Sequence, residues 1–186
     1  MRSNVLEDYH GALRHMSQPS GTEEERNESM TSGKHGITVL IIDDDEFTRQ
    51  KAKMILEDNF PYEVLTAPSG MDGVEVLLQN KVHLILLDVT MPGWTGFKTL
   101  SVIREKVLLR NIPVVMLTAA ADRDSIIRAS RYKVEDYIRK PFMPEELVSR
   151  VAKVVWEHWP DEGFETLSWI LRNGSEPWTE DTVSEM

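Results

Sequence analysis

The chain has 186 residues, of which 41% are hydrophobic, and its formal net charge is -10. This length suits one domain with room left for tails. The absence of cysteine excludes disulfides and thiolate metal sites, and no apolar stretch approaches the roughly 20 residues that cross a bilayer. Because residues 1–36 also lack the apolar core of a signal peptide, we expect a cytoplasmic protein that does not enter the membrane.

The negative charge is concentrated near the C-terminus. Residues 157–186 contain eight acids and one arginine, whereas residues 37–156 are nearly neutral. An acidic tail repels the phosphate backbone of nucleic acids. Direct binding of nucleic acid by this chain is therefore not expected.

Residues 1–36 are mostly polar without a sustained hydrophobic period, which predicts a disordered N-terminal extension. From residue 37 onward, apolar runs of strand length alternate with longer segments of helical period. The predicted strands are 37–42, 62–66, 83–88, 112–117 and 134–139. The predicted helices are 46–58, 70–79, 95–106, 122–131 and 144–158.

Several predicted strands are apolar at successive positions rather than at alternate ones, as in Leu84–Leu87. Such strands are buried on both faces, as in a parallel sheet between two helix layers. The pattern predicts an α/β fold with a doubly wound, five-stranded parallel sheet. Ligands of these sheets bind beyond the carboxyl ends of the strands, where Asp43, Asp88, Thr118 and Lys140 fall.

Residues 157–186 form an acidic, tryptophan-rich C-terminal extension. Acids at its start, Arg172 and then Gly174 predict a short extra helix over residues 162–172. Large indole rings usually require burial. The extension either folds back on its own domain or serves as a docking or dimerisation segment, and protection from proteolysis in dilute monomer would distinguish the two.

Asp43, Asp44 and Asp88 bring about three negative charges to neighbouring strand ends, an arrangement that favours a bound cation. Ligands that are all oxygen select a hard ion, and Mg2+ is the expected one. The alternative is that the acids from Asp43 to Glu46 cap the first helix, since aspartate is a favoured N-cap residue.

Four motifs follow one another at four separate strand ends. They are Asp43-Asp44, then Asp88-Val89-Thr90-Met91-Pro92-Gly93, then Thr118-Ala119, and finally Tyr137-Ile138-Arg139-Lys140-Pro141-Phe142. Together they resemble the receiver domain of bacterial two-component response regulators, a CheY-like domain with a flavodoxin-like fold, and the match covers about residues 37–156.

The resemblance implies a role for each of these positions. Asp88 would be the phosphoacceptor, a carboxylate nucleophile that forms an aspartyl phosphate. Asp44, Asp88 and the backbone carbonyl of Thr90 would bind Mg2+, and Asp43 would act mainly through a metal-bound water. Lys140 and Thr118 would contact phosphoryl oxygens. On its position alone, Thr118 would be an ordinary strand-end threonine.

The resemblance also implies a switch, in which Thr118 moves toward the phosphoryl group and Tyr137 turns inward behind it. The alternative for Tyr137 is a half-buried ring at the sheet edge. Phosphorylation would then change the surface formed by residues 122–131, 134–139 and 144–158. In this family the peptide bond before Pro141 is cis, which an X-Pro bond tolerates readily.

Two departures from the family pattern stand out. Lys133 occupies a position that is normally glycine, so either the turn differs or Lys133 accepts a strained conformation that costs about 1 kcal/mol. The positions that tune access of water to the phosphoryl group hold the uncharged Thr90 and Ala120. We therefore hypothesise slow self-dephosphorylation.

Taken together, the sequence predicts a signalling domain rather than an enzyme, since it would catalyse only its own phosphotransfer and dephosphorylation. Its expected partners are a histidine kinase or histidine phosphotransfer protein, a downstream protein target and a second copy in a possible homodimer. The first alternative is an adaptor that binds proteins without phosphorylation. An aspartyl-nucleophile phosphohydrolase would need an acid in place of Thr90, and a nucleotide-binding module would need a glycine-rich loop after the first strand.

Overall fold

A parallel five-stranded sheet forms the centre of the part of the chain that the computed structural model describes, residues 36–119, 133–160 and 163. The strands are β1 (Thr38–Ile42), β2 (Glu63–Ala67), β3 (Leu84–Asp88), β4 (Val114–Thr118) and β5 (Asp136–Arg139). Their order in the sheet is β2-β1-β3-β4-β5. The predicted doubly wound sheet is confirmed, and each strand begins within two residues of its predicted start.

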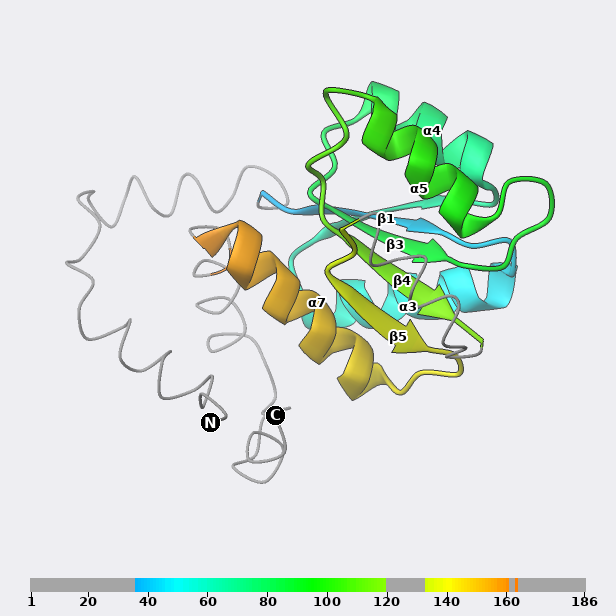
Figure 1. Ribbon diagram of the computed structural model, residues 1–186. Coiled ribbons are helices and arrows are strands. Elements are labelled where there is room, and N and C mark those ends of the chain that lie inside the picture. The colour runs from blue at the N-terminus through cyan, green and yellow to red at the C-terminus, as the bar shows by residue number, and fades with distance from the viewer. Residues whose placement is uncertain (1–35, 120–132, 161–162, 164–186) are drawn as a thin grey trace, which may run out of the picture. The chain divides into compact units, whose positions relative to one another are not determined.

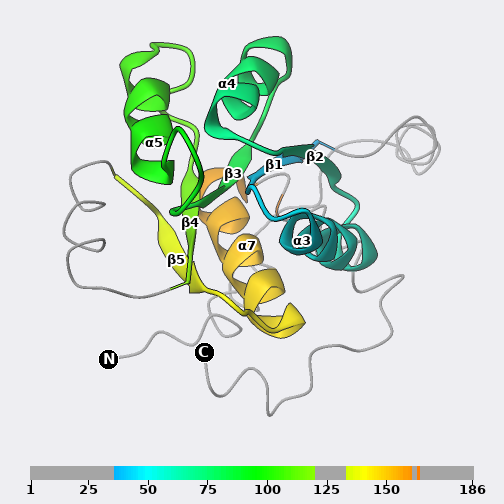
Figure 2. The ribbon, with the colours of Figure 1, turned by 90° about the vertical axis from the view of Figure 1, so that its right-hand side faces the viewer.

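Helices cover both faces of this sheet (Figures 1 and 2). The helices α3 (Glu46–Asn59) and α7 (Pro144–His158) pack together on one face, and α4 (Gly70–Gln79) and α5 (Gly96–Glu105) pack together on the other. These four agree with the predicted helices, while the helix predicted over residues 122–131 lies outside the described residues. None of the helices in the described part of the chain has the length and apolar character of a membrane span.

The three central strands are the core of the fold. Every residue of β1, β3 and β4 is buried, and on one face of the sheet their apolar side chains form a single cluster with buried residues of α4 and α5. Successive apolar residues are needed here because both faces of the sheet are covered. The strands change from apolar to charged residues only where they leave this core, at Asp43 and Asp88.

Lys133 has a positive φ angle of 51°, so the second of the two possibilities for this position is confirmed. This left-handed conformation costs a residue with a Cβ atom about 1 kcal/mol. Arg104 at the end of α5 helps to hold it, because its guanidinium donates to the carbonyl oxygens of Lys133 at 3.0 Å and of Ile112 at 2.9 Å. Burial lowers the pKa of Arg104, and the negative charge of Glu135 partly opposes this shift.

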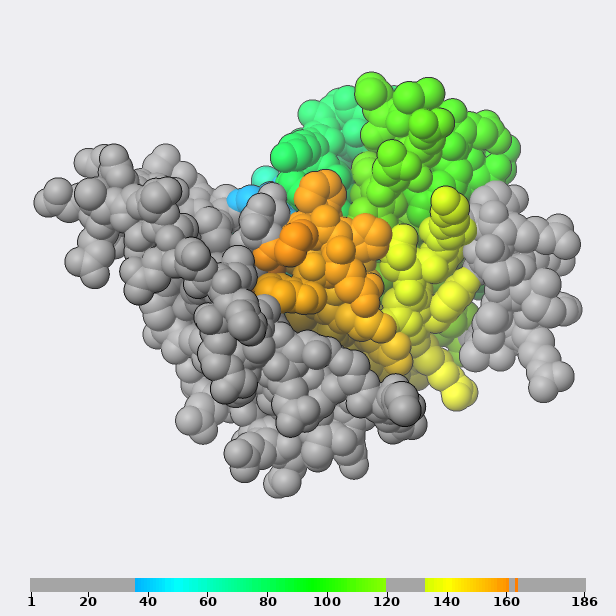
Figure 3. Space-filling model, turned by 60° about the vertical axis from the view of Figure 1, so that its left-hand side comes forward, coloured from blue at the N-terminus to red at the C-terminus, as the bar shows by residue number. Residues whose placement is uncertain are grey.

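The chain beyond α7 begins by packing against its own domain. The indole Nε1 of Trp159 donates to the carbonyl oxygen of His83 at 3.2 Å, and the two rings meet edge to face with centroids 5.2 Å apart. Gly163 lies against Trp156, where a Cβ atom would come within 3.0 Å of the indole ring. Figure 3 shows the C-terminal part of α7 and the residues that follow it in orange, beside the yellow part of the chain around β5.

These contacts favour the fold-back interpretation for Trp159 and Gly163. The predicted domain boundary at residue 156 falls inside α7, which ends at His158. The predicted helix over residues 162–172 lies outside the described residues except for Gly163, whose N–H donates to the carbonyl oxygen of Trp159 at 2.8 Å. The predicted extension over residues 1–36 also lies outside them, apart from Gly36.

Candidate functional site

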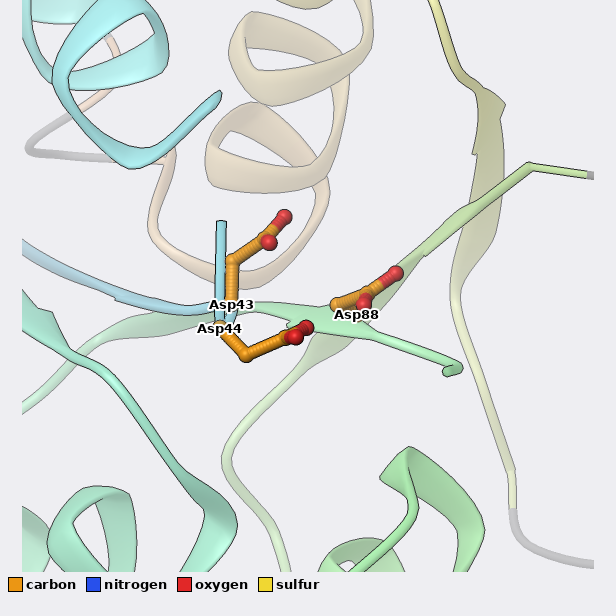
Figure 4. Close-up of side chains that lie close together, drawn as sticks. All are labelled: Asp43, Asp44 and Asp88. Carbon is orange, nitrogen blue, oxygen red and sulfur yellow. The ribbon is translucent and has the colours of Figure 1, made fainter. Parts of the chain in front are cut away.

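Three carboxylates converge at the carboxyl ends of β1 and β3. Asp43 and Asp44 directly follow β1, Asp88 is the last residue of β3, and the two strands are paired up to Ile42 and Leu87. One oxygen from each carboxylate lies within 4.8 Å of the others. Figure 4 shows the three side chains together at this edge. Asp43 and Asp88 are buried, at 0% and 3% exposed, whereas Asp44 is exposed.

Lys140 places a positive charge beside two of these carboxylates. Its Nζ lies 2.5 Å from Oδ2 of Asp43 and 3.0 Å from Oδ1 of Asp88. The residue directly follows β5, and its backbone N–H donates to the carbonyl oxygen of Thr118 at 2.7 Å, which joins the ends of β4 and β5. The Lys140-Pro141 peptide bond is cis, as the resemblance implied.

Burial and ion pairing shift the pKa values of Asp88 and Lys140. Burial raises the pKa of Asp88 and outweighs the opposing hydrogen bond and charge of Lys140. Burial alone would lower the pKa of Lys140, but its hydrogen bonds to Asp43 and Asp88 and their negative charges prevail and raise it. Lys140 is therefore a stable cation at neutral pH, held between two carboxylates.

Helix capping accounts for Asp45 rather than for the acids of the cluster. The carboxylate of Asp45 accepts hydrogen bonds from the N–H of Thr48 at 3.0 Å and from its hydroxyl at 2.5 Å. These bonds lower the pKa of Asp45. Asp43 accepts the N–H of Asp45 at 3.0 Å through Oδ1, which leaves Oδ2 directed to Lys140. The capping alternative is thus correct for Asp45 and does not explain Asp43 and Asp88.

Arg49 is part of the site and was not predicted. Its Nη1 donates to the carbonyl oxygens of Asp43 at 2.7 Å and Asp44 at 3.0 Å, which fixes the backbone that carries both acids. The sequence does contain a signal for it, because a basic residue near a helix N-terminus opposes the helix dipole and therefore suggests a specific local partner.

The other predicted residues lie around the same edge. Thr118 is buried at the end of β4, and Tyr137 is half-buried on β5 against the core. Burial raises the pKa of Tyr137. Thr90 is exposed two residues after Asp88, and its backbone N–H opposes the effect of burial on the pKa of Asp88. Ala120 lies outside the described residues.

The donor atoms fit a hard divalent cation. Among the described residues, Oδ2 of Asp43 is buried without a hydrogen-bond donor in good geometry, although it is ion-paired with Lys140. A buried carboxylate oxygen of this kind, close to two further carboxylates, retains lone pairs for a metal ion. The chemistry of the site thus agrees with the predicted Mg2+.

A buried carboxylate beside a lysine and two further acids, at the carboxyl edge of a parallel sheet, defines a receiver type of signalling domain. The family model for the response regulator receiver domain matches residues 39–152, and the chain belongs to this family. The sequence-based resemblance is therefore confirmed.

Two relatives are transcriptional regulators. The chain is 37% identical over 120 residues to the phosphate regulon transcriptional regulatory protein PhoB of Pseudomonas aeruginosa, covering 64% of this chain and 52% of that protein. It is 34% identical over 117 residues to the transcriptional regulatory protein SrrA of Staphylococcus aureus, covering 63% and 47% respectively. The chain therefore spans about half the length of these relatives.

Solved structures match the domain over nearly their whole length. The chemotaxis protein CheY4 of Vibrio cholerae is 28% identical with a TM-score of 0.62, covering 64% of this chain and 99% of that one. A putative response regulator from Chloroflexus aurantiacus is 32% identical with a TM-score of 0.61, covering 65% and 98%. The similarity supports both the fold and the family.

Proposed function

We propose that this chain accepts a phosphoryl group on Asp88 from a histidine kinase or histidine phosphotransfer protein and signals through protein contacts that depend on phosphorylation. The observation that carries this proposal is the pair formed by Asp88 and Lys140, whose Oδ1 and Nζ lie 3.0 Å apart beside Asp43 and Asp44. In this proposal the domain acts in the cytoplasm and turns over no external substrate.

In the proposed reaction, a carboxylate oxygen of Asp88 attacks the phosphorus of a phosphohistidine. The new O–P bond forms as the P–N bond breaks, and the electron pair of that bond stays on the imidazole of the donor. Mg2+, held by Asp43, Asp44, Asp88 and the backbone carbonyl of Thr90, would neutralise charge on the carboxylates and on the transferring group.

Lys140 would contact negatively charged oxygen atoms both before and after the phosphoryl transfer. Before transfer its ammonium is paired with the carboxylates of Asp43 and Asp88. After transfer the charge lies on the phosphoryl oxygens, and Lys140 would contact one of them as a point charge. The hydroxyl of Thr118 would donate a hydrogen bond to another, with Tyr137 moving inward behind it.

The proposal is tested by measuring intact mass after incubation with a small phosphodonor, with and without Mg2+. We expect the wild type to gain one phosphoryl group only with Mg2+ and the Asp88→Asn variant to gain none. An Asp58→Asn variant is the matched control, because Asp58 is exposed on α3 away from the cluster. No gain by the wild type in any condition would refute phosphotransfer and favour the phosphorylation-independent adaptor.

The lifetime of the phosphorylated form tests a finer part of the proposal. Thr90 is uncharged and would neither hold nor attract an attacking water strongly, which favours slow self-dephosphorylation. The measurement is the decay of the phosphorylated mass after removal of the donor. A lifetime of only seconds would contradict this hypothesis while leaving phosphotransfer itself intact.

A further inference from the structure

The position of Lys140 depends on a short turn between β5 and α7. The last sheet contact before this turn is the hydrogen bond from the N–H of Lys140 to the carbonyl oxygen of Thr118, at 2.7 Å. The first hydrogen bond of α7 after the turn runs from the N–H of Leu147 to the carbonyl oxygen of Met143. Pro141 has no N–H to donate, so the turn needs support from elsewhere.

Lys51, on α3, provides such support. Its Nζ donates to the carbonyl oxygen of Phe142 at 3.0 Å and lies over the ring of the same residue, 5.3 Å from the centroid. Phe142 is itself 3% exposed, so the contact links α3 to a buried anchor two residues after Lys140. A cation that both hydrogen-bonds a carbonyl and faces an aromatic ring has a well-defined position.

The same helix also holds the acids of the cluster. Arg49, two residues before Lys51, donates to the carbonyl oxygens of Asp43 and Asp44. The first turns of α3 therefore support the backbone on both sides of the ion pair between Asp43 and Lys140. A shift of either backbone segment would change the distance between Asp43 and Lys140, because each residue lies at or within two positions of an anchored carbonyl.

From this geometry we infer that Lys51 is a positioning residue for Lys140. It fixes the turn over residues 140–142 and thereby directs the Lys140 ammonium to Asp43 and Asp88. The inference rests on the proposed function for its effect on phosphotransfer, but its effect on the position of Lys140 does not require phosphorylation. Nothing in the receiver motifs themselves includes Lys51, which lies on the first helix outside all four of them.

Lys53 offers a matched control on the same helix. Its Nζ also donates to a backbone carbonyl, that of Val64 at 3.1 Å, and it is ion-paired with Glu57 at 3.7 Å. Val64 lies inside β2, at the far edge of the sheet from β5. Lys51→Met and Lys53→Met therefore remove the same kind of contact, and only the first affects the turn that carries Lys140.

The first measurement is the rate of phosphorylation by a small phosphodonor at saturating Mg2+. We expect Lys51→Met to lower this rate about tenfold, since a small misplacement of a reacting or stabilising group can cost up to about 100-fold. Lys51→Arg keeps a cationic donor and should restore the rate, and Lys53→Met should match the wild type. Saturating Mg2+ keeps any effect of a displaced Lys140 ammonium on metal affinity out of this comparison.

The second measurement needs no phosphorylation. Limited labelling with an amine-reactive reagent, mapped by mass spectrometry, reports how well Lys140 is protected by burial and ion pairing, and its side chain is 17% exposed in the intact site. We expect faster labelling of Lys140 in Lys51→Met and wild-type labelling in Lys53→Met. If Lys51→Met does not fold, Lys51→Gln takes its place.

The outcomes separate the two proposals. Equal rates and equal Lys140 labelling in Lys51→Met and Lys53→Met would overturn the positioning role, as would failure of Lys51→Arg to restore the rate in a folded protein. A wild type that accepts no phosphoryl group would refute the proposed function. In that case the labelling of Lys140 still decides whether Lys51 holds the turn.

Discussion

Replacing Asp88 by asparagine should make the protein more stable when no divalent cation is present. Asp88 is 3% exposed and shares the site with the carboxylates of Asp43 and Asp44, whose oxygens lie within 4.8 Å. The neighbouring cation is Lys140, at 3.0 Å, and it is shared with Asp43. The stability of the wild type therefore includes the cost of concentrating these charges.

The size of this cost follows from the distances. At an effective dielectric constant of about 20, a like charge at 4.8 Å destabilises Asp88 by roughly 3 kcal/mol, and Lys140 at 3.0 Å stabilises it by roughly 5 kcal/mol. Repulsion from two carboxylates thus about cancels this attraction, and the desolvation of the buried carboxylate remains. We expect Asp88→Asn to gain about 1–3 kcal/mol in the free energy of unfolding.

The gain should depend on pH in a defined direction. Burial raises the pKa of Asp88 above its ordinary value of 3.8, so the folded protein binds this proton more tightly than the unfolded chain does. The destabilisation is absent below 3.8, grows as pH rises through the raised pKa of the folded state, and is complete above it. The advantage of asparagine should therefore be larger at about pH 8 than at about pH 4, close to the ordinary pKa.

Urea unfolding in the presence of a chelator measures this effect at both pH values. The exposed Asp58→Asn control should change stability by no more than about 0.5 kcal/mol. Added Mg2+ should stabilise the wild type more than Asp88→Asn, because the variant has one carboxylate fewer to bind the ion. A variant that is no more stable than the wild type at the higher pH, or whose gain is independent of pH, would refute the electrostatic reasoning.

Three further substitutions test the surroundings of the site. Gly96→Ala would place a Cβ atom 2.1 Å from the carbonyl oxygen of Asp88. This overpacking should lower the free energy of unfolding in urea by about 1–3 kcal/mol and slow phosphorylation, and an unchanged stability and rate would contradict the close approach. Trp159→Ala removes the hydrogen bond to the carbonyl of His83 at 3.2 Å and should lower the free energy of unfolding by about 2 kcal/mol. The phosphorylation rate should not change, because His83 precedes β3 and Asp88 lies at the other end of that strand. Lys133→Gly relieves a positive φ angle of 51° and should raise stability by about 1 kcal/mol, whereas a loss would show that the lysine side chain contributes more than the strain costs.

Most of the fold follows from local pattern. Runs such as Leu84–Leu87 are apolar on both faces, and only a parallel sheet between helix layers buries them, so periodicity alone predicts both the strands and their surroundings. Acids placed directly after such runs must lie at the carboxyl edge of that sheet. The proximity of Asp43 and Asp88 was therefore predictable without coordinates.

The tertiary structure decided what depends on contacts between distant segments. Asp43, Asp44 and Asp45 are alike in sequence, and only their backbone directions assign capping to Asp45 and leave Asp43 facing Lys140. The donation from Lys51 to the carbonyl of Phe142 joins residues 91 positions apart. A backbone carbonyl accepts a hydrogen bond whatever its side chain is, so no residue pattern marks the acceptor, and such a contact becomes visible only when the chain is folded.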